Sequence, residues 1–258
     1  MSNESISTNK LTIGYRDPHS EVRVQTDLTF SLQTGEMVCM LGPNGCGKST
    51  LLRTLAGLQP AIEGEFRIQN SAFSIQHSDV RTQKSKEVAL VLTERLSMDN
   101  TTVHDVVAMG RYPYTSFLGG LTAEDERIIA ESLEKVGFGQ SIGRSFFNAH
   151  SDGEKQRILI AKALAQQTPI ILLDEPTAHL DLPHRILVLR LLRQLAHEQG
   201  KTVLISTHEL DLALALSDRI LLMTPGKGVQ LDTAENLRKS DAFTQAFGMD
   251  IFSPLGEI

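Results

Sequence analysis

The stretch MVCMLGPNGCGKST, residues 37–50, decides the fold of this chain. Its first part, MVCML at 37–41, is apolar at every position, as a strand covered on both faces of a sheet would be. The segment STLLRTLAGL, which begins at Ser49, has a helical period, and Gly57 suits the end of a helix. Between them, GPNGCGKST at 42–50 fits the pattern G-x-x-x-x-G-K-[ST] of a phosphate-binding loop. A buried strand, a glycine-rich loop and a helix in this order predict a nucleotide-binding α/β domain.

The residue types of this loop suit a triphosphate. Gly42, Gly45 and Gly47 let the backbone N–H groups turn toward phosphate oxygens, and the helix that starts near Lys48 adds its positive end. We expect the Lys48 ammonium to reach the β- and γ-phosphates and the Ser49 hydroxyl to bind Mg²⁺. The alternative is a plain glycine turn, which the complete pattern in this context disfavours. The other residues expected to line the nucleotide are Pro43, Asn44, Cys46 and Thr50.

The composition is that of an ordinary globular protein. The chain has 258 residues, 41% hydrophobic and 22% charged, enough for one large α/β domain or a core with a small subdomain. Its formal net charge of -6 argues against a nucleic-acid-binding protein, which usually carries a basic face. The two cysteines, Cys39 and Cys46, are too few and too close for a disulfide framework, which favours a reducing cytoplasm. We expect Cys46 to be a small spacer, although a cysteine near a helix N-terminus can have a lowered pKa.

Membrane segments are not predicted. No apolar run approaches the roughly 20 residues that cross a bilayer, and the N-terminal MSNESISTNK lacks the apolar stretch of a signal peptide. Any membrane role would therefore come through a partner.

Further apolar runs predict how the sheet continues. They are typical of strands buried on both faces, and they are VALVL at 88–92, IILLD at 170–174, TVLIST at 202–207 and RILLM at 219–223. Helical segments separate them, which predicts a mostly parallel sheet with helices on both faces. Near the N-terminus, LTIGY and LTFSLQTGE alternate apolar and polar residues, as half-buried antiparallel strands do.

The pattern between about 93 and 165 is mostly helical. Thr122 and Asp125 signal the start of a helix, and Gly137 suits its end. We therefore expect a helical subdomain over 93–165, inserted into a core that 1–92 and 166–258 form, so that 1–258 is a single domain.

Two acidic residues follow the strand IILLD at its carboxyl end. We expect Asp174 to hold Mg²⁺ through water and Glu175 to polarise the attacking water, since open sheets of this kind bind ligands at that edge. The alternative is that the acids only end the strand. His208 follows TVLIST, and if that strand lies beside Asp174 we expect His208 to contact the γ-phosphate. The alternative is a structural histidine.

The stretch NAHSDGEKQR, residues 148–157, has two interpretations. Ser151 and Glu154 fit the S-x-x-E capping box that begins a helix. The same hydroxyl, glycine and acids also suit phosphate and ribose. We predict that this helix end serves both purposes.

The motifs GPNGCGKST, SDGEKQR, LLDEPTAHLD and STHELD occur in the order found in ATP-binding subunits of ABC transporters. The chain resembles this family over nearly its whole length. The resemblance implies a RecA-like P-loop NTPase core with a mostly parallel sheet, an N-terminal antiparallel β-subdomain and an inserted helical signature subdomain. It also implies ATP hydrolysis with Mg²⁺ in a head-to-tail homodimer, where each ATP lies between the phosphate loop of one subunit and the signature of the other.

The resemblance also implies roles for single residues. Tyr15 matches the aromatic that stacks on adenine, and the alternative is a tyrosine that only ends a strand. Ser151 and Gly153 match the signature contacts to the γ-phosphate, and Asp181 lies in the loop that links the two sites.

Two places depart from the family pattern. Thr93 stands where a glutamine should contact Mg²⁺ and water, and threonine could do so only through backbone movement or a bridging water. The signature Leu-Ser-Gly-Gly-Gln becomes HSDGE at 150–154. If position 152 needs a positive φ, Asp152 tolerates it better than most residues other than glycine, and Glu154 can still accept hydrogen bonds from ribose hydroxyls. Because Lys48, Asp174, Glu175 and His208 are retained, we expect an active ATPase, either with altered coupling or from a coherent variant subfamily.

The segment VVAMGRYPYTSFLGGLTAEDERIIAESLEKVGF, at 106–138, is similar to importers of iron-siderophore complexes, haem and cobalamin. This similarity implies permease subunits as partners, an indirect link to a substrate-binding protein, no nucleic acid, and a peripheral location at the cytoplasmic face of the inner membrane. One alternative is an ABC-type ATPase of a non-transport machine for DNA repair or translation, which usually carries coiled coils or tandem cassettes. Another is a nucleotide-binding regulatory subunit with little turnover.

Overall fold

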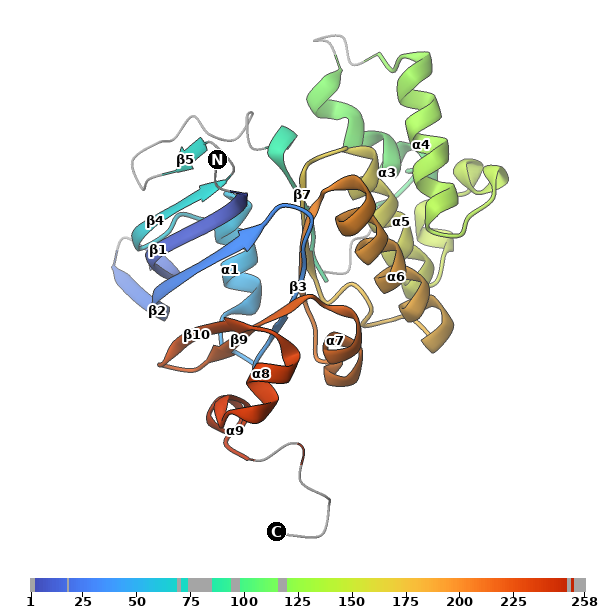
Figure 1. Cartoon of the computed structure of the whole chain (residues 1–258). Coiled ribbons are helices and arrows are strands. Elements are labelled where there is room, and N and C mark those ends of the chain that lie inside the picture. The colour runs from blue at the N-terminus through green and yellow to red at the C-terminus, as the bar shows by residue number, and fades with distance from the viewer. Residues whose placement is uncertain are drawn as a thin grey trace.

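Two β-sheets lie on either side of helix α1, and further helices cover the far side of the larger sheet (Figure 1). The computed structural model describes residues 3–17, 19–68, 71–73, 85–93, 98–115, 120–249 and 252. The larger sheet has the order β10-β9-β3-β8-β7-β6. Its strands are β3 (Met37–Leu41), β6 (Val88–Val91), β7 (Ile170–Asp174), β8 (Thr202–Ser206), β9 (Arg219–Thr224) and β10 (Gly228–Asp232). All neighbours are parallel except the pair β9 and β10, so the predicted mostly parallel sheet is confirmed.

The smaller sheet is antiparallel, as the alternating N-terminal pattern predicts. Its order is β2-β1-β4-β5. The strands are β1 (Glu4–Asp17), β2 (Ser20–Gln33), β4 (Glu63–Ile68) and β5 (Ser71–Phe73). The long hairpin of β1 and β2 lies over α1 (Lys48–Leu55), so this sheet covers one side of the phosphate-binding loop.

Strand β3 explains why its sequence is apolar at every position. Val38 and Met40 belong to a core shared with the antiparallel sheet and α1. Met37, Cys39 and Leu41 belong to a second core on the other face, under the helices. Because successive side chains of a strand point to opposite faces, a strand between two cores must be apolar throughout.

The remaining helices cover the second core. They are α3 (Val103–Ala108), α4 (Ala123–Lys135), α5 (Asp152–Ala165), α6 (Leu182–Gln199) and α7 (Leu210–Leu216), with α8 (Ala234–Lys239) and α9 (Ala242–Phe247) near the C-terminus. Short 3-10 helices η1 (Met109–Tyr114), η2 (Gln140–Arg144) and η3 (Phe147–Ala149) connect α3, α4 and α5. The elements from α3 to α5 come between β6 and β7 in the chain, and α3 and α4 project to one end of the molecule (Figure 1). Within the described residues no helix is both long and apolar enough to span a membrane.

A buried ion pair holds these helices together. Arg111 Nε donates to Asp125 Oδ1 at 2.8 Å, and its Nη1 donates to the carbonyl of Ala165 at 2.7 Å, at the end of α5. Asp125 also accepts from the backbone N–H and the hydroxyl of Thr122, which completes the predicted capping box of α4. These bonds, led by those from Thr122, lower the pKa of Asp125 to about 2. The arginine and the aspartate of the segment that resembles importers therefore form a structural junction.

We expect Arg111→Met to lower the melting temperature by roughly 6–12 °C, because it leaves a buried carboxylate without its cation. Asp125→Asn should also destabilise the protein at neutral pH. The folded pKa of Asp125 is depressed, so its stabilising effect is present above the ordinary value of 3.8 and is lost as the pH falls through about 2.

Urea unfolding of wild type and Asp125→Asn from pH 7 to pH 3 measures this effect. The difference between the two unfolding free energies should stay constant down to about pH 4 and become smaller toward pH 3, where protonation of Asp125 in the unfolded chain begins to remove it. Glu235→Gln, which removes a carboxylate from an exposed pair with Lys239, is the control and should change little at any pH. A constant difference between wild type and Asp125→Asn across the range would show that the pair does not act through the charge of Asp125.

Candidate functional site

The phosphate-binding loop folds as its glycines predict. Gly47 is the N-cap of α1 with φ +106°, and a Cβ there would lie 2.9 Å from Val24 Cγ1. Gly42 has φ +154°, and a Cβ there would lie 2.6 Å from the Met223 carbonyl oxygen. Both positions combine a left-handed backbone with close packing, so only glycine fits them. The loop therefore presents a bare backbone at the carboxyl end of β3.

Lys48 lies at the first position of α1 and is buried. Its Nζ donates to the carbonyl oxygens of Gly42, at 2.7 Å, and Pro43, at 3.2 Å. The ammonium is thus held at the loop by backbone carbonyls, next to the turn that encloses the expected phosphates. The neighbouring Ser49 hydroxyl lies at the same helix end, half-buried.

Cys46 is a buried spacer within the loop, packed into the core beneath the antiparallel sheet. Burial raises the pKa of its thiol, although Lys48 acts in the opposite direction. A lowered pKa of Cys46 is therefore the wrong expectation, because the loss of hydration outweighs the charge of the lysine.

Tyr15 is on β1, and its ring is 48% exposed. Its hydroxyl lies 3.1 Å from Thr50 Oγ1 in α1, so the phenol is attached to the helix that follows the phosphate-binding loop. A half-exposed ring with its hydroxyl tied down offers a flat apolar face beside the loop.

The predicted acids lie at the carboxyl end of β7. Asp174 is buried, and its Oδ1 accepts a hydrogen bond of 2.5 Å from Ser206 Oγ, the last residue of β8. Glu175 has the positive φ of +45°, and its backbone N–H points to both Ser206 Oγ, at 3.0 Å, and the Ser206 carbonyl, at 3.1 Å. Strands β7 and β8 are neighbours in the sheet, as predicted, with Asp174 opposite Ser206.

Sequence reasoning assigned no role to Ser206. The signal was available, because IILLD and TVLIS have the same length, and both end in a polar residue. In-register parallel pairing would have placed those two ends side by side.

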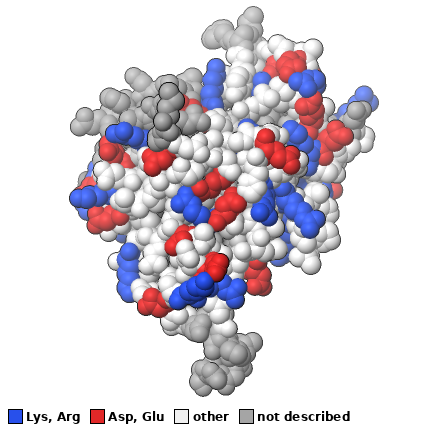
Figure 2. All heavy atoms as spheres, in the orientation of Figure 1, with Lys and Arg blue, Asp and Glu red and all other residues white. Residues whose placement is uncertain are grey.

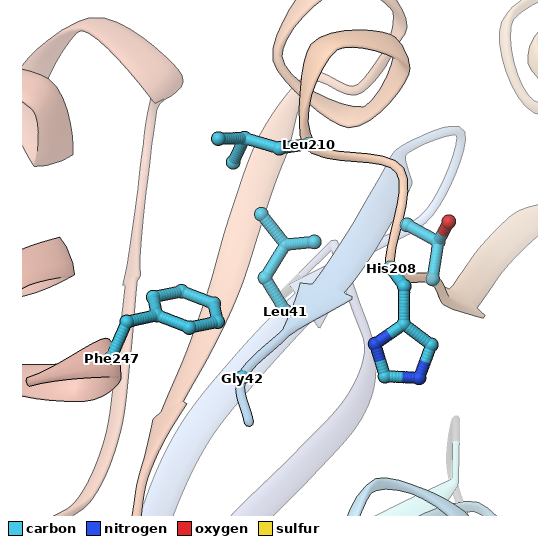
Figure 3. A pocket seen from close by; sticks show the side chains of 6 residues that line it. Leu41, Gly42, His208, Leu210 and Phe247 are labelled. Carbon is cyan, nitrogen blue, oxygen red and sulfur yellow. The ribbon is translucent and has the colours of Figure 1, made fainter. Parts of the chain in front are cut away.

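His208 lies at the same edge and forms an ion pair with Glu175, from Nε2 to Oε1. Both side chains are partly exposed, His208 at 46% and Glu175 at 31%. Beside His208 is a pocket of about 180 Å³ lined by Leu41, Gly42, Thr207, His208, Leu210 and Phe247. Figure 3 shows Leu41, Leu210 and Phe247 around this space, with the His208 ring directed away from Leu210. The pocket is mostly apolar and borders the phosphate-binding loop at Gly42.

Thr93 follows β6 and reaches β7. Its Oγ1 donates to the Asp174 carbonyl oxygen at 2.7 Å. The hydroxyl hydrogen is therefore committed to the backbone, and only the oxygen lone pairs are left for a water or a cation. Thr93 and Ser206 thus hold Asp174 from the two neighbouring strands.

The second predicted half-site is the start of α5. Ser151 is the N-cap, its Oγ accepts from the Glu154 N–H at 3.3 Å, and Glu154 Oε2 accepts from the Ser151 N–H at 3.0 Å. Oε2 also accepts from the Ser151 hydroxyl at 2.9 Å. These bonds lower the pKa of Glu154, with a smaller effect from His150. The predicted capping box is confirmed, and the carboxylate is turned inward onto the cap.

Asp152 is the first helical residue and is not among the residues with positive φ. Position 152 therefore does not have the positive φ that aspartate would tolerate better than most residues. Gly153 packs against the loop after β7, since a Cβ there would lie 2.8 Å from the His179 carbonyl oxygen. The signature helix thus contacts the loop that leads to Asp181.

Asp181 is the N-cap of α6, where it accepts from the His184 N–H at 3.2 Å and also contacts the His184 ring. Its bond to the His184 side chain is the largest cause of its lowered pKa. Arg157, buried in α5, lies close enough to Glu154 and Asp181 for both acids to favour its charged form, although burial lowers its pKa. This guanidinium offsets part of the negative charge at the signature end.

The fold and this site define a class. These are the elements of an ATP-binding cassette. They are a strand, a phosphate-binding loop and a helix beside an Asp-Glu pair, together with a helical insertion that carries a second capped helix. Residues 25–178 match the model of the ABC transporter family. The chain belongs to this family, as an ATP-binding subunit with the fold and the ATPase chemistry of its cassettes.

Relatives span nearly the whole chain. The iron(3+)-hydroxamate import ATP-binding protein of Bacillus subtilis is 37% identical over 95% of this chain and 88% of its own length. The hemin import ATP-binding protein of Pseudomonas fluorescens is 38% identical over 88% of each. A dimeric ATP-binding cassette solved in a post-hydrolysis state with ADP and Pi is 27% identical, with a TM-score of 0.79 over 89% of this chain and 98% of that one.

Proposed function

We propose that this chain hydrolyses ATP to drive the import of an iron chelate, haem or cobalamin through a membrane permease. The main observation behind the proposal is that the phosphate-binding loop lies at the same sheet edge as Asp174, Glu175 and His208. The likeness to import proteins for iron(3+)-hydroxamate and hemin supports the substrate class.

The loop and β7 together fit Mg²⁺ and a triphosphate. Ser49 supplies a hydroxyl and Asp174 a carboxylate, the hard oxygen ligands that Mg²⁺ prefers, and α1 packs against β7. Lys48 binds the β- and γ-phosphates, and the backbone of 42–50 encloses them. The Thr93 oxygen would accept a hydrogen bond from a water on the cation, since its own hydrogen is donated to the Asp174 carbonyl. The bound cation neutralises phosphate charge when present.

Glu175 and His208 are the catalytic residues of this proposal. Glu175 is partly exposed at the sheet edge and accepts a proton from the attacking water. His208 holds the Glu175 carboxylate in the free subunit and turns to the γ-phosphate when nucleotide is bound.

A second copy of the chain completes each site. The start of α5, with Ser151 and Gly153, faces the triphosphate of the partner, and Asp181 lies in the loop that links the two sites. Asp152 and Glu154 lie at the same helix end, and Tyr15 stacks on adenine. Support comes from the related cassette that is dimeric with ADP and Pi.

Glu154→Gln should increase ATP-driven dimerisation. A glutamine still completes the capping box, so α5 keeps its start. The substitution removes a negative charge near the triphosphate, and it weakens the bond that now takes the Ser151 hydrogen, because a carboxylate is the stronger acceptor. We expect half-maximal dimer formation at an ATP concentration about three- to tenfold lower.

Size-exclusion chromatography across ATP concentrations, in a Glu175→Gln background that traps ATP, measures this shift. Glu134→Gln removes an exposed charge from the same helical region and should have no effect. If Glu154→Gln instead needed a higher ATP concentration for half-maximal dimer formation, the carboxylate would contribute to nucleotide binding.

Partners and location follow from the proposed activity. Two permease subunits receive the motion of the dimer, and a substrate-binding protein delivers the cargo. The chain then lies at the cytoplasmic face of the inner membrane. The helical region over 93–165 is proposed as the part that contacts the permease, inserted into a core of 1–92 and 166–258. On the face shown in Figure 2, acidic and basic side chains are mixed, unlike the basic face that is typical of a nucleic-acid-binding protein.

Copurification with the permease and ATPase assays test the proposal. In proteoliposomes, phosphate release should rise when the matching binding protein is loaded with an iron chelate, haem or cobalamin. No phosphate release from the assembled complex would instead support a regulatory subunit. Release that no permease stimulates would support a non-transport machine.

A further inference from the structure

Ser206 lies between the two acids of the site and is fully buried. It is the last residue of β8, and the parallel register sets it opposite Asp174. Its hydroxyl donates to Asp174 Oδ1 at 2.5 Å and accepts from the Glu175 backbone N–H at 3.0 Å. A hydroxyl has one hydrogen, and an ionised carboxylate can only accept, so the direction of both bonds is determined.

The backbone of Glu175 depends on the same residue. Its φ of +45° is uncommon for a residue with a side chain and has an energetic cost. The Glu175 N–H is shared by the Oγ and the carbonyl oxygen of Ser206, so both acceptors favour this conformation. In this conformation the Glu175 carboxylate reaches His208.

We propose that Ser206 is a positioning residue of the ATPase reaction. It orients the carboxylate of Asp174 toward the site and keeps Glu175 in its left-handed conformation. Thr93 assists from the other side through the Asp174 carbonyl, so that two hydroxyls hold the corner between β7 and the loop that follows. The inference rests on the proposed roles of Asp174 and Glu175, although the contacts themselves do not.

Ser206→Ala and Ser206→Thr test the proposal. Alanine removes the hydroxyl and leaves the Asp174 carboxylate without its buried donor. Threonine keeps the hydroxyl and suits a strand. Ser132→Ala is the matched control, because Ser132 is also buried and its hydroxyl donates to one carbonyl, that of Ile128, far along the chain from this corner.

Three measurements separate positioning from folding. The first is kcat as a function of Mg²⁺ concentration. The second is the affinity for a fluorescent ATP analogue with and without Mg²⁺, in a Glu175→Gln background without turnover. The third is thermal unfolding. We expect Ser206→Ala to lower kcat and to raise half-saturating Mg²⁺, each about tenfold, the factor that one charge-assisted hydrogen bond contributes.

The gain in analogue affinity on adding Mg²⁺ should shrink in Ser206→Ala, while affinity without Mg²⁺ stays at the wild-type value. Ser206→Thr should recover most of kcat, and Ser132→Ala should match wild type. Wild-type kcat and Mg²⁺ response in Ser206→Ala would overturn the proposal. So would equal loss in alanine and threonine variants together with lost Mg²⁺-free binding, which would indicate a structural role. A wild type that releases no phosphate would refute the proposed function instead.

Discussion

Glu175→Gln should lower ATP turnover by about 10²- to 10⁴-fold, the range that a general base contributes, while ATP stays bound. Glutamine has the size of glutamate and can still hydrogen-bond His208, but its amide cannot accept the proton of the attacking water. The phosphate-binding loop is untouched, so nucleotide affinity should not fall. Phosphate release and retention of radiolabelled ATP, measured on the same preparation with its permease, check both parts.

The control for this variant is Glu198→Gln, an exposed position on α6 that makes the same change of charge away from the site. It should turn over like wild type. If Glu175→Gln also does so, Glu175 is not the base, and its ion pair with His208 serves only to order the sheet edge.

Lys48→Met should weaken ATP binding by about 10²- to 10³-fold, since two charge-assisted hydrogen bonds to phosphate are lost. Methionine fills the buried path of the lysine stem but carries no donor. The carbonyls of Gly42 and Pro43 also lose their ammonium partner, so the loop itself should loosen.

Isothermal titration with MgATP measures the affinity, and thermal unfolding without nucleotide measures the loosening. Lys239→Met removes the same charge from an exposed pair with Glu235 and is the control. Unchanged affinity in Lys48→Met would mean that the ammonium remains on the loop carbonyls when ATP binds.

The departures at Thr93 and Glu154 acquire a common explanation from the structure. Each side chain is engaged locally, Thr93 with the Asp174 carbonyl and Glu154 with the cap of α5. Both side chains therefore bond to groups of their own corner of the proposed nucleotide site. The altered coupling that the sequence predicts would follow from a more tightly held corner and a more tightly held signature cap.

Local patterns were enough to predict much of this protein. The apolar run of β3, the glycines at 42 and 47 and the capping boxes at Thr122 and Ser151 are properties of neighbouring residues, and each is confirmed. Such features depend on backbone angles and on a spacing of a few residues, which the sequence states directly.

Other features were decided only by tertiary structure. Burial of Cys46 raises its pKa although the nearby lysine favours the thiolate, and desolvation depends on what packs around the thiol. Ser206 joins Asp174 and Glu175 only because β8 pairs in register with β7 across a long stretch of intervening chain. The importer-like segment becomes a junction because Arg111 reaches both Asp125 and the end of α5. The sequence by itself determined the elements and the residue types of the site, whereas strand order, register and burial decided which of those side chains meet.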